Sequence, residues 1–554
     1  MAVAALTPPG GERRFDNPDI QKLERTTMIR TRRLLATAAM CCMALFLGAC
    51  GGGGDDSGGD EGPATTSGAA GDPVAGGHGR ILMLAETSSL DPAKLGNAYA
   101  ATAVLGNALY GTLMIDDEKG EVVYKMAESF TTSDNGSTFE LRLRPGLVFS
   151  DGSPFDAAAV KANWERHKDP AVGSVYRGDA TNIASTEVVD ATTLKVSMAA
   201  SMPNFPDVVL GTGLNWVASP AALQGGPQAF ETNPIGAGPF TLKKWTRQAD
   251  IDLVKNTRYW DAPRPYLDSL TIRSAVDARQ RYNTLLTGGA DIAVESDWVN
   301  LHKAADDGLP SILKPVNGGI LMTLNMRRAP FDDIRARQAV AAAIDLESLN
   351  LAVYEGDGQP AETLFDDSSP FYSEEPLRHF DRELAQRLFD ELAAEGKPVS
   401  FTFTSFPSSE NRAIAENVQA QLSSFKNVKV EVKVVQLAEI AKLRVTNDFD
   451  TYVTSAFFQD PEPRLWSAFN GSSATNVPGV NDPELNEALM TGRTSTVEAE
   501  RRSAYETVQQ RLGDVTPGVF LQRVALGAVS GEKVGGLTQY GLGSLLPEEL
   551  WIQK

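Results

Sequence analysis

The amino-acid sequence predicts an α/β protein that also contains a region of mixed α+β structure. Three observations lead to this prediction. The 554 residues are 42% hydrophobic and 22% charged, which is an ordinary balance for globular domains. Strand and helix patterns alternate in the second half of the chain, as they do in βαβ units with a parallel sheet. In the first half, short segments of alternating hydrophobicity are separated by turn residues, which is typical of antiparallel hairpins.

The N-terminal region has the features of an export signal. Three arginines between positions 30 and 33 precede an uncharged, mostly apolar run over residues 34–47, which is too short for a stable membrane span. Small residues follow this run, as they do at cleavage sites. We therefore expect residues 1–49 to be a signal peptide, with translation starting either at Met1 or at Met28.

Cys50 directly follows this leader, in the tetrapeptide Leu47-Gly48-Ala49-Cys50. The tetrapeptide resembles the lipobox of bacterial lipoproteins, which implies cleavage before Cys50 and attachment of lipid to its thiol. Residues 50–79 are mostly small, polar or acidic and cannot offset the entropy of ordering, so we expect a flexible linker there. The protein would then be exported and anchored by its lipid on the outer face of the cytoplasmic membrane. A buried helix that ends in an unimportant cysteine is the alternative.

The net charge of −20 argues against a nucleic-acid partner and for solubility. Cys41, Cys42 and Cys50 are the cysteines of the chain. Only Cys50 would remain after cleavage, so we expect neither an intramolecular disulfide nor cysteine chemistry.

The first half contains strand patterns and few long helices. Residues 80–85 have the pattern of a buried strand, and a helix of small residues is expected over about 98–109. Residues 138–143 alternate between apolar and polar side chains, as in a strand with one buried face. We expect a hairpin-rich domain over residues 117–234.

The second half alternates between helices and strands. Val428, Val430, Val432 and Val434 are separated by charged residues, which predicts a strand with one wet face near a sheet edge. The order of the elements predicts a βαβαβ unit with a parallel sheet. The expected helices are 383–392, 411–425 and 438–445, and the expected strands are 400–404, 428–434 and 451–454.

Catalytic and cofactor-binding patterns are absent from the sequence. It contains no nucleophile elbow, no phosphate-binding loop and no zinc-protease motif. Its four histidines are scattered and lack the spacing of metal ligands, so we expect packing or surface roles for them. Gly236-Ala237-Gly238 is followed by Pro239 instead of a helix, which indicates a turn. We expect no metal, no cofactor and no enzymatic activity.

Several blocks resemble, in the same order, the extracellular solute-binding proteins of the peptide/nickel/oligopeptide type (family 5), which supply ABC importers. The resemblance spans about residues 80–551. The blocks are Met126-Ala127-Glu128-Ser129, Phe149-Ser150-Asp151-Gly152-Ser153-Pro154, Asn233-Pro234-Ile235-Gly236-Ala237-Gly238-Pro239-Phe240, Pro330-Phe331-Asp332-Asp333 with Ala343-Ile344-Asp345, and Asp460-Pro461 with Asn481-Asp482-Pro483.

The resemblance implies a two-lobed clamp like that of type II periplasmic binding proteins, with an extra mixed α+β domain. Lobe I would combine residues 80–116, 235–319 and 526–554, and lobe II would span 320–525. The segment 117–234 would form the extra domain. The implied partners are a small solute or peptide and an ABC permease with its ATPase subunits, and we expect a monomer.

Binding residues are expected where strands end at the interface between the lobes, because sites in α/β lobes gather at the carboxyl ends of strands. Asn325 and Arg327 could bind a polar or anionic group, and the aromatic side chains could cover an apolar one. The candidates are Ser88, Asp91, Asn325, Arg327, Phe457, Phe458, Gln459, Asp460 and Trp466.

One departure from the family pattern concerns the ligand. The resemblance implies that peptide binders hold the α-ammonium with an aspartate a few residues before the Asp/Glu-Pro step, where this chain has Ala456, Phe457 and Phe458. Two phenylalanines supply no counter-charge to an ammonium group. A peptide or peptide-like solute is still the prediction, and a sugar derivative, an opine or a metal chelate is the near alternative. A sensory lipoprotein and an anchored hydrolase are more distant alternatives.

Overall fold

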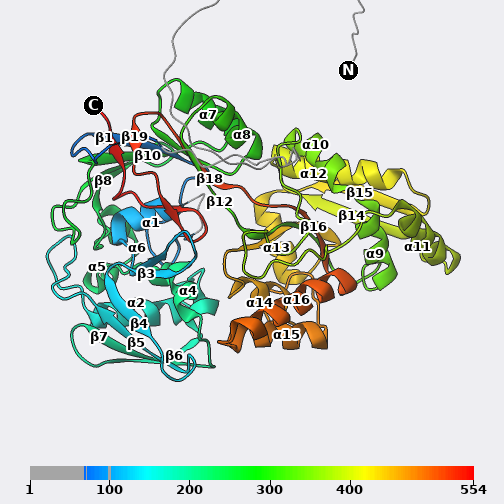
Figure 1. The fold of residues 1–554 in the computed structure, drawn as a ribbon, viewed down its shortest axis with the longest axis horizontal. Coiled ribbons are helices and arrows are strands. Elements are labelled where there is room, and N and C mark those ends of the chain that lie inside the picture. The colour runs from blue at the N-terminus through cyan, green and yellow to red at the C-terminus, as the bar shows by residue number, and fades with distance from the viewer. Residues whose placement is uncertain (1–67, 70, 98–101) are drawn as a thin grey trace, which may run out of the picture. The chain divides into compact units, whose positions relative to one another are not determined.

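The computed structural model describes residues 68–69, 71–97 and 102–554, which all belong to one compact unit, Glu61–Lys554 (Figure 1). The predicted signal peptide, Cys50 and most of the predicted linker lie outside the described residues. Two large β-sheets and a four-stranded sheet organise the described chain.

The first large sheet has seven strands in the order β12-β18-β11-β1-β10-β9-β8. Strand β1 runs parallel to β10 and β11, and the other neighbours pair antiparallel. Ile81 and Met83 enter one hydrophobic core and Leu82 enters another, so both faces of the sheet are covered. We call this sheet and its helices lobe I. Its elements are β1 His78–Met83, β8 Phe240–Trp245, β9 Asp250–Lys255, β10 Ser269–Ser274, β11 Ile292–Glu295, β12 Ser311–Lys314, β18 Leu526–Ser530, α1 Ala103–Tyr110, α7 Ala278–Leu286 and α8 Trp298–Asp306.

The predicted linker over residues 50–79 is too long at its C-terminal end. Strand β1 begins at His78 and pairs with β10 from that residue onward. Further upstream, the amide of Ala69 donates a hydrogen bond to the carbonyl of Val534 at 2.8 Å. Composition does not reveal these backbone partners, because they come from segments far along the chain.

The hairpin domain contains a four-stranded antiparallel sheet in the order β4-β5-β7-β6. Phe139, Leu141 and Leu143 of β5 are buried, as the alternation predicts, and Trp164 of α2 packs into the same core. Asp156 caps α2 by accepting a hydrogen bond from the amide of Ala159. The elements from β2 to α6 are β2 Met114–Asp116, β3 Val122–Tyr124, β4 Ala127–Thr131, β5 Thr138–Leu143, α2 Ala157–Lys168, α3 Arg177–Ala180, β6 Ile183–Val188, β7 Thr193–Met198, α4 Phe205–Leu210, the 3₁₀ turn η1 Gly213–Asn215, α5 Pro220–Gln224 and α6 Pro227–Thr232.

The second large sheet has five strands in the order β15-β14-β16-β13-β17. Strand β14 is parallel to both β15 and β16, which confirms the predicted βαβαβ unit. Strand β15 is at the edge with one face wet, as its alternation predicts. Strand β16 continues to Phe458, beyond the predicted end, because it pairs along the whole length of β13. The strands are β13 Asn317–Leu324, β14 Val399–Ser405, β15 Val428–Val434, β16 Thr451–Phe458 and β17 Gly518–Gln522.

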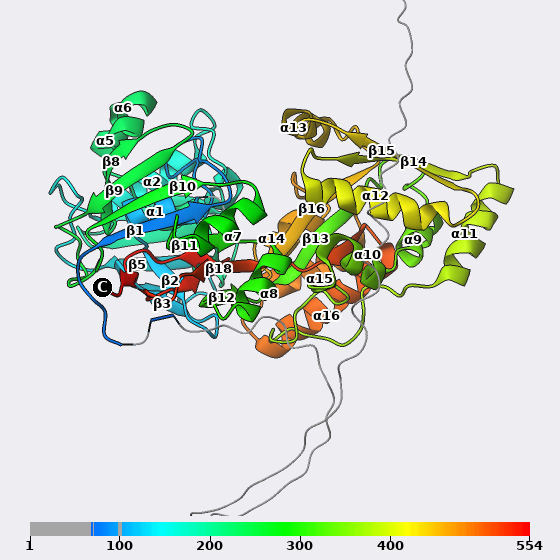
Figure 2. The same ribbon diagram turned by 90° about the horizontal axis from the view of Figure 1, so that it is seen from above.

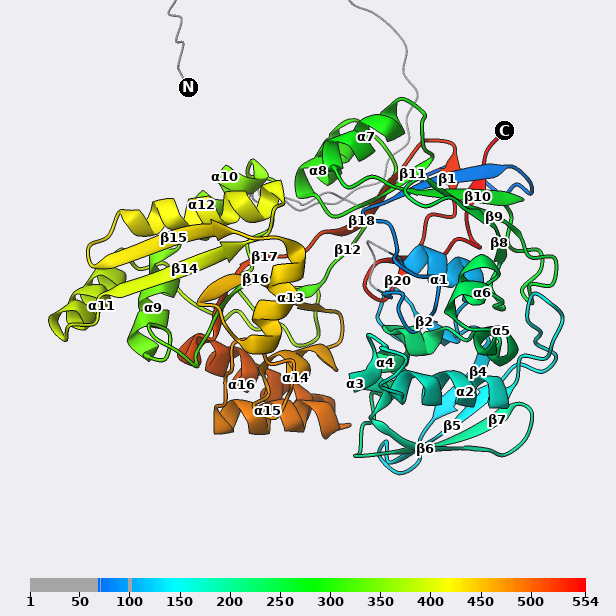
Figure 3. The same ribbon diagram turned by 180° about the vertical axis from the view of Figure 1, so that it is seen from behind.

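Helices cover both faces of this sheet, and together they form lobe II. Helices α9 to α12 pack on one face and α14 to α16 on the other (Figures 2 and 3). Asp333 caps α9 by accepting from the amide of Arg335 at 3.0 Å. The helices are α9 Ile334–Ala343, α10 Leu346–Tyr354, α11 Arg382–Ala394, α12 Ser409–Ser423, α13 Leu437–Thr446, α14 Arg464–Phe469, α15 Pro483–Thr494 and α16 Glu498–Val515.

The chain passes between the two lobes twice, from β12 to β13 and from β17 to β18. The C-terminal segment then returns to lobe I with the short strands β19 Val534–Gly535, β20 Gln539–Tyr540, β21 Ser544–Leu545 and β22 Trp551–Ile552. Lobe II also contacts the hairpin domain, where Nη2 of Arg493 donates to Oδ1 of Asn182 at 3.1 Å. Among the described residues, no helix combines the length and the apolar character needed to cross a bilayer.

Candidate functional site

A cleft of about 2140 Å³ lies between lobe I, the hairpin domain and lobe II. Lobe I contributes residues 312–315, 537–539, 541 and 542. The hairpin domain contributes the residues around the β2–β3 turn, α3 and α4, and lobe II contributes the C-terminal end of β16 and helix α14. Because β16 belongs to the parallel part of its sheet, this is the edge at which α/β folds usually place ligands.

Five of the nine predicted binding residues line this cleft. Phe457 is half-buried, whereas Phe458 is only 2% exposed and packs edge-on against Phe365 with ring centroids 5.7 Å apart. The guanidinium of Arg493 stacks over Trp466, 4.5 Å from the ring centroid. The five lining residues are Phe457, Phe458, Gln459, Asp460 and Trp466.

Gln459 and Asp460 are held by other side chains at the cleft wall. The amide nitrogen of Gln459 donates to the carboxylate of Asp116 in β2, which joins opposite sides of the cleft. Lys314 also contacts Asp116, at 3.0 Å. Asp460 accepts two hydrogen bonds from Arg501. Both residues therefore shape the cleft through contacts within the protein.

Ser88 and Asp91 do not line the cleft. Ser88 is exposed, and its carbonyl accepts a hydrogen bond from Arg247 at 3.1 Å. Asp91 is buried and accepts from Nη1 of Arg166 at 2.8 Å. Burial raises the pKa of Asp91, but the hydrogen bonds and charge of Arg166 outweigh it, so the pKa stays below its ordinary value.

Asn325 and Arg327 also lie outside the cleft lining. Asn325 is fully buried and donates to the carbonyl of Phe449 at 2.7 Å. Arg327 donates to the carbonyls of Asn476 and Val477, both at 2.8 Å. Their polar groups bind backbone carbonyls of the loop that precedes β16 and of the loop between α14 and α15.

The structure adds charged residues to the cleft that the sequence analysis did not single out. Asp179 in α3 and Asp207 in α4 line it from the hairpin domain, and Glu462 lines it from lobe II. Burial raises the pKa of Asp179 to about 6 and that of Asp207 to about 8, the latter with a contribution from the charge of Asp460. No local signal marks these residues, because the docking of the domains creates their surroundings.

Glu462 is the most buried of these acids. Its side chain is 0% exposed, and in the described structure neither of its carboxylate oxygens has a hydrogen-bond partner. The nearest cation is Arg493, 3.6 Å away. Burial raises the pKa of Glu462 to about 8 against the attraction of Arg493.

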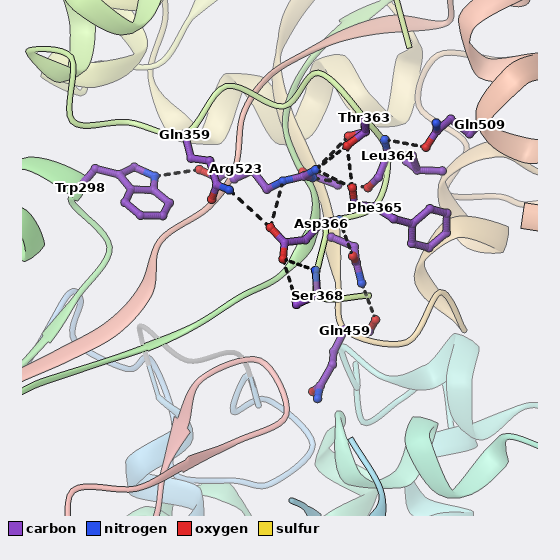
Figure 4. Close-up of polar contacts among 12 residues, drawn as sticks. Trp298, Gln359, Thr363, Leu364, Phe365, Asp366, Ser368, Gln459, Gln509 and Arg523 are labelled. Carbon is purple, nitrogen blue, oxygen red and sulfur yellow. Dashed lines mark hydrogen bonds and ion pairs between the residues drawn. The ribbon is translucent and has the colours of Figure 1, made fainter. Parts of the chain in front are cut away.

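Arg523 connects the second crossover to the cleft wall (Figure 4). Its guanidinium donates to the carbonyls of Gly318 at 2.9 Å and Phe365 at 2.8 Å, and it lies 3.7 Å from the carboxylate of Asp366. Asp366 lines the cleft. On the other side, the indole nitrogen of Trp298 in lobe I donates to the carbonyl of Arg523 at 3.0 Å. This crossover is thus bonded to both lobes.

Metal-binding geometry is not found in the described part of the chain, where no group of three or more His, Cys, Asp or Glu side chains could hold an ion. His167 illustrates the packing role expected for the histidines. It is buried, its Nδ1 lies 2.7 Å from the hydroxyl of Ser174, and burial lowers its pKa to about 4.

Comparisons with known proteins agree with this architecture. The model of the family described as "Bacterial extracellular solute-binding proteins, family 5 Middle" matches residues 121–476. The glutathione-binding protein GsiB of Pectobacterium atrosepticum is 27% identical over 502 residues, which cover 85% of this chain and 93% of that protein. GsiB of Escherichia coli K12 is 30% identical over 368 residues, which cover 64% of this chain and 69% of that protein.

Solved structures show the same fold. The binding protein AgaA of A. tumefaciens R10, in complex with agropinic acid, has a TM-score of 0.75 and 24% identity, and the match covers 86% of this chain and 99% of AgaA. The oligopeptide-binding protein AppA of Bacillus subtilis, in complex with a nonapeptide, has a TM-score of 0.75 and 22% identity, with 87% and 100% covered. The predicted fold class, a two-lobed α/β clamp with an additional mixed domain, is confirmed.

Proposed function

Because this chain belongs to family 5 of the bacterial extracellular solute-binding proteins, we propose that it captures a peptide or peptide-like solute and delivers it to the permease of an ABC importer. The cleft between lobe I, the hairpin domain and lobe II carries the proposal. Closure of such lobes removes a solute from water and creates a surface that a permease can recognise.

The size of the cleft favours a solute larger than a single amino acid. Its volume of about 2140 Å³ exceeds the roughly 300–1,000 Å³ that is common for sites of drug-sized ligands. The relatives named for glutathione and the solved complex of AppA with a nonapeptide concern peptides. A peptide of a few residues is therefore the solute class with most support.

The distribution of charge in the cleft supports a solute with ionised ends. Asp179 and Asp207 face it from the hairpin domain, and Arg444 and Arg464 face it from lobe II. A peptide carries an ammonium and a carboxylate at opposite ends. Asp207 has no cation within ion-pair distance among the described residues, and its raised pKa keeps it mostly protonated when no solute is bound. A bound ammonium group would lower that pKa and favour the ionised carboxylate, which Phe457 and Phe458 cannot provide.

The proposal includes export and a lipid anchor at Cys50, supported by the lipobox-like sequence Leu47-Gly48-Ala49-Cys50. A protein held at the membrane stays close to a membrane permease. In cells, Cys50→Ala should move the exported protein from the membrane fraction to the soluble fraction. Retention of Cys50→Ala in the membrane would overturn the lipid anchor.

The proposed role needs no catalysis, and the relatives named above are binding proteins. Calorimetry of the purified domain with di-, tri- and tetrapeptides should give Kd values in the micromolar range or tighter. Mass spectrometry of small molecules retained through purification provides an independent identification. If no peptide binds and the retained molecule is an opine, a sugar derivative or a metal chelate, the peptide assignment is wrong. Turnover of a bound peptide would overturn the non-enzymatic role.

A further inference from the structure

Two of the four arginines that line the cleft have no acidic partner. Arg493 and Arg501 pair with Glu462 at 3.6 Å and Asp460 at 2.9 Å. Within the described part of the chain, neither Arg444 nor Arg464 lies within 4.0 Å of a carboxylate. Both are solvent-exposed where they line the cleft. The unpaired guanidiniums are therefore accessible to a solute.

The unpaired arginines flank the end of β16. Arg464 is the first residue of α14, and its Nη2 donates to the carbonyl of Ser455 at 2.7 Å. Arg444 lies in the last turn of α13 and lines the cleft together with Thr454, Ser455 and Phe457. The hydrogen bond to Ser455 fixes the Arg464 side chain, so little of its freedom remains to be lost when a ligand binds.

The positive charges of the two residues act on each other. Although Arg464 is exposed to the cleft, partial desolvation of its guanidinium by the surrounding protein lowers its pKa, and the charge of Arg444 lowers it further. Like charges at a partly desolvated site are unfavourable unless an anion neutralises them. Asp179 attracts Arg464 from the opposite wall but does not come within ion-pair distance, and burial raises the pKa of Asp179 in spite of the charge of Arg464. No carboxylate among the described residues therefore occupies the position where an anion would neutralise Arg444 and Arg464.

A second cavity adjoins the main cleft at Arg444. It has a volume of about 350 Å³ and shares Arg444, Thr454, Ser455 and Phe457 with the main cleft. Its other walls include the apolar side chains Ile414 and Val453. A group bound between the arginines would thus have Phe457 beside it and an adjoining space for an apolar substituent.

We propose that Arg444 and Arg464 together bind a carboxylate of the transported solute. For a peptide-like solute this group is the C-terminal carboxylate, and this part rests on the function proposed above. Two guanidiniums can each give two parallel hydrogen bonds to carboxylate oxygens, which a neutral carboxamide accepts less well.

The test compares one peptide as its C-terminal acid and as its C-terminal amide, by calorimetry. Wild-type protein should bind the acid about 10- to 100-fold more tightly than the amide, as expected when a charge-assisted hydrogen bond is lost. Arg444→Gln and Arg464→Gln should each weaken binding of the acid by about 10-fold or more and leave binding of the amide within about twofold. Arg464→Lys should recover part of the loss. Arg387→Gln, on the exposed face of α11 and outside the cleft lining, is the matched control and should change neither affinity.

Equal binding of acid and amide by the wild type would overturn this inference and leave the proposed function intact. If no peptide binds, the proposed function is wrong. Carboxylate binding by Arg444 and Arg464 is then tested with glutarate and its diamide as probes. Glutarate, but not the diamide, should raise the Tm of the wild type, and the double variant Arg444→Gln, Arg464→Gln should lose this shift. A glutarate effect that persists in the double variant, or no effect in the wild type, would overturn the inference.

Discussion

Nη2 of Arg501 donates to both carboxylate oxygens of Asp460, at 2.9 and 3.2 Å. The same arginine lies over the ring of Phe371, 4.9 Å from its centroid, and Asp460 also accepts a hydrogen bond from the amide of Glu462. Asp460 therefore lines the cleft while it forms an ion pair with Arg501, and this pair joins α16 to the turn after β16.

This ion pair predicts the effect of Asp460→Ala. The substitution would leave the half-buried cation of Arg501 unpaired, so we expect a loss of about 2–4 kcal/mol in the free energy of unfolding. Urea denaturation measures this loss, and Asp460→Asn should lose less because it keeps one acceptor. Calorimetry should show that solute affinity falls less than in Arg464→Gln. Unchanged stability together with a large loss of affinity would show instead that Asp460 is a direct ligand residue.

Asp91 should be a structural residue. Asp91→Ala removes the partner of Arg166 in a pair whose side chains are only 10% and 26% exposed, so it should destabilise the protein by about 2–3 kcal/mol without changing solute affinity. Glu140→Ala is the matched control, because Glu140 and Arg142 form a largely exposed pair. The control should cost less than about 0.5 kcal/mol. A solute affinity that falls in Asp91→Ala would contradict this assignment.

Adjacent phenylalanines at the end of β16 should have different roles. Phe458 is part of the lobe II core, so Phe458→Ala should cost about 3–5 kcal/mol of stability. Phe457 is half-buried and lines both cavities, so Phe457→Ala should cost less stability and weaken solute binding. Thermal denaturation and calorimetry on both variants separate the two effects. Similar stability losses in both variants would refute the distinction.

Glu462 should make stability dependent on pH. An unfolded chain releases this proton near the ordinary pKa of 4.5, whereas the folded protein retains it up to about pH 8. Stability is therefore lost as the pH rises from about 4.5 to 8. Glu462→Gln removes this loss, so its advantage in Tm over the wild type should grow between pH 5 and pH 8, by an amount corresponding to about 3–4 kcal/mol.

Glu498 provides the control for that experiment, because it lines the same cleft but is exposed. Glu498→Gln should show a Tm difference that stays nearly constant over the same pH range. A constant difference for Glu462→Gln as well would mean that Glu462 is ionised in the folded protein at neutral pH.

Local periodicity was sufficient to predict the elements whose stability comes from their own side-chain pattern. The alternation of Val428–Val434 with charged residues predicted the edge strand β15, and the order of the helices and strands predicted its parallel pairing. The end of β16 was predicted too early. Its last residues are held by pairing with Asn317 and Gly318 of β13, which are distant in sequence.

The sequence predicted correctly only those cleft residues that lie at the end of a strand. Phe457 to Asp460 reach the cleft because β16 ends there. Asp207 and Arg464 could not be predicted in the same way. They line the cleft only because separate domains meet there, and in the described part of the chain neither has an oppositely charged side chain within ion-pair distance. Conversely, Asn325 has the right position after a strand, but its amide satisfies the carbonyls of a neighbouring loop.

The bonding of Arg523 restricts how the clamp can move. Its guanidinium ties the segment after β17 to lobe II, and the indole of Trp298 ties its carbonyl to lobe I, so little unbonded chain remains at that crossing. The other crossing, between Lys314 and Asn317, is equally short. Two short connections between the lobes define a single rotation axis. Opening should therefore be a rotation about that axis, with twisting and sliding of one lobe against the other suppressed.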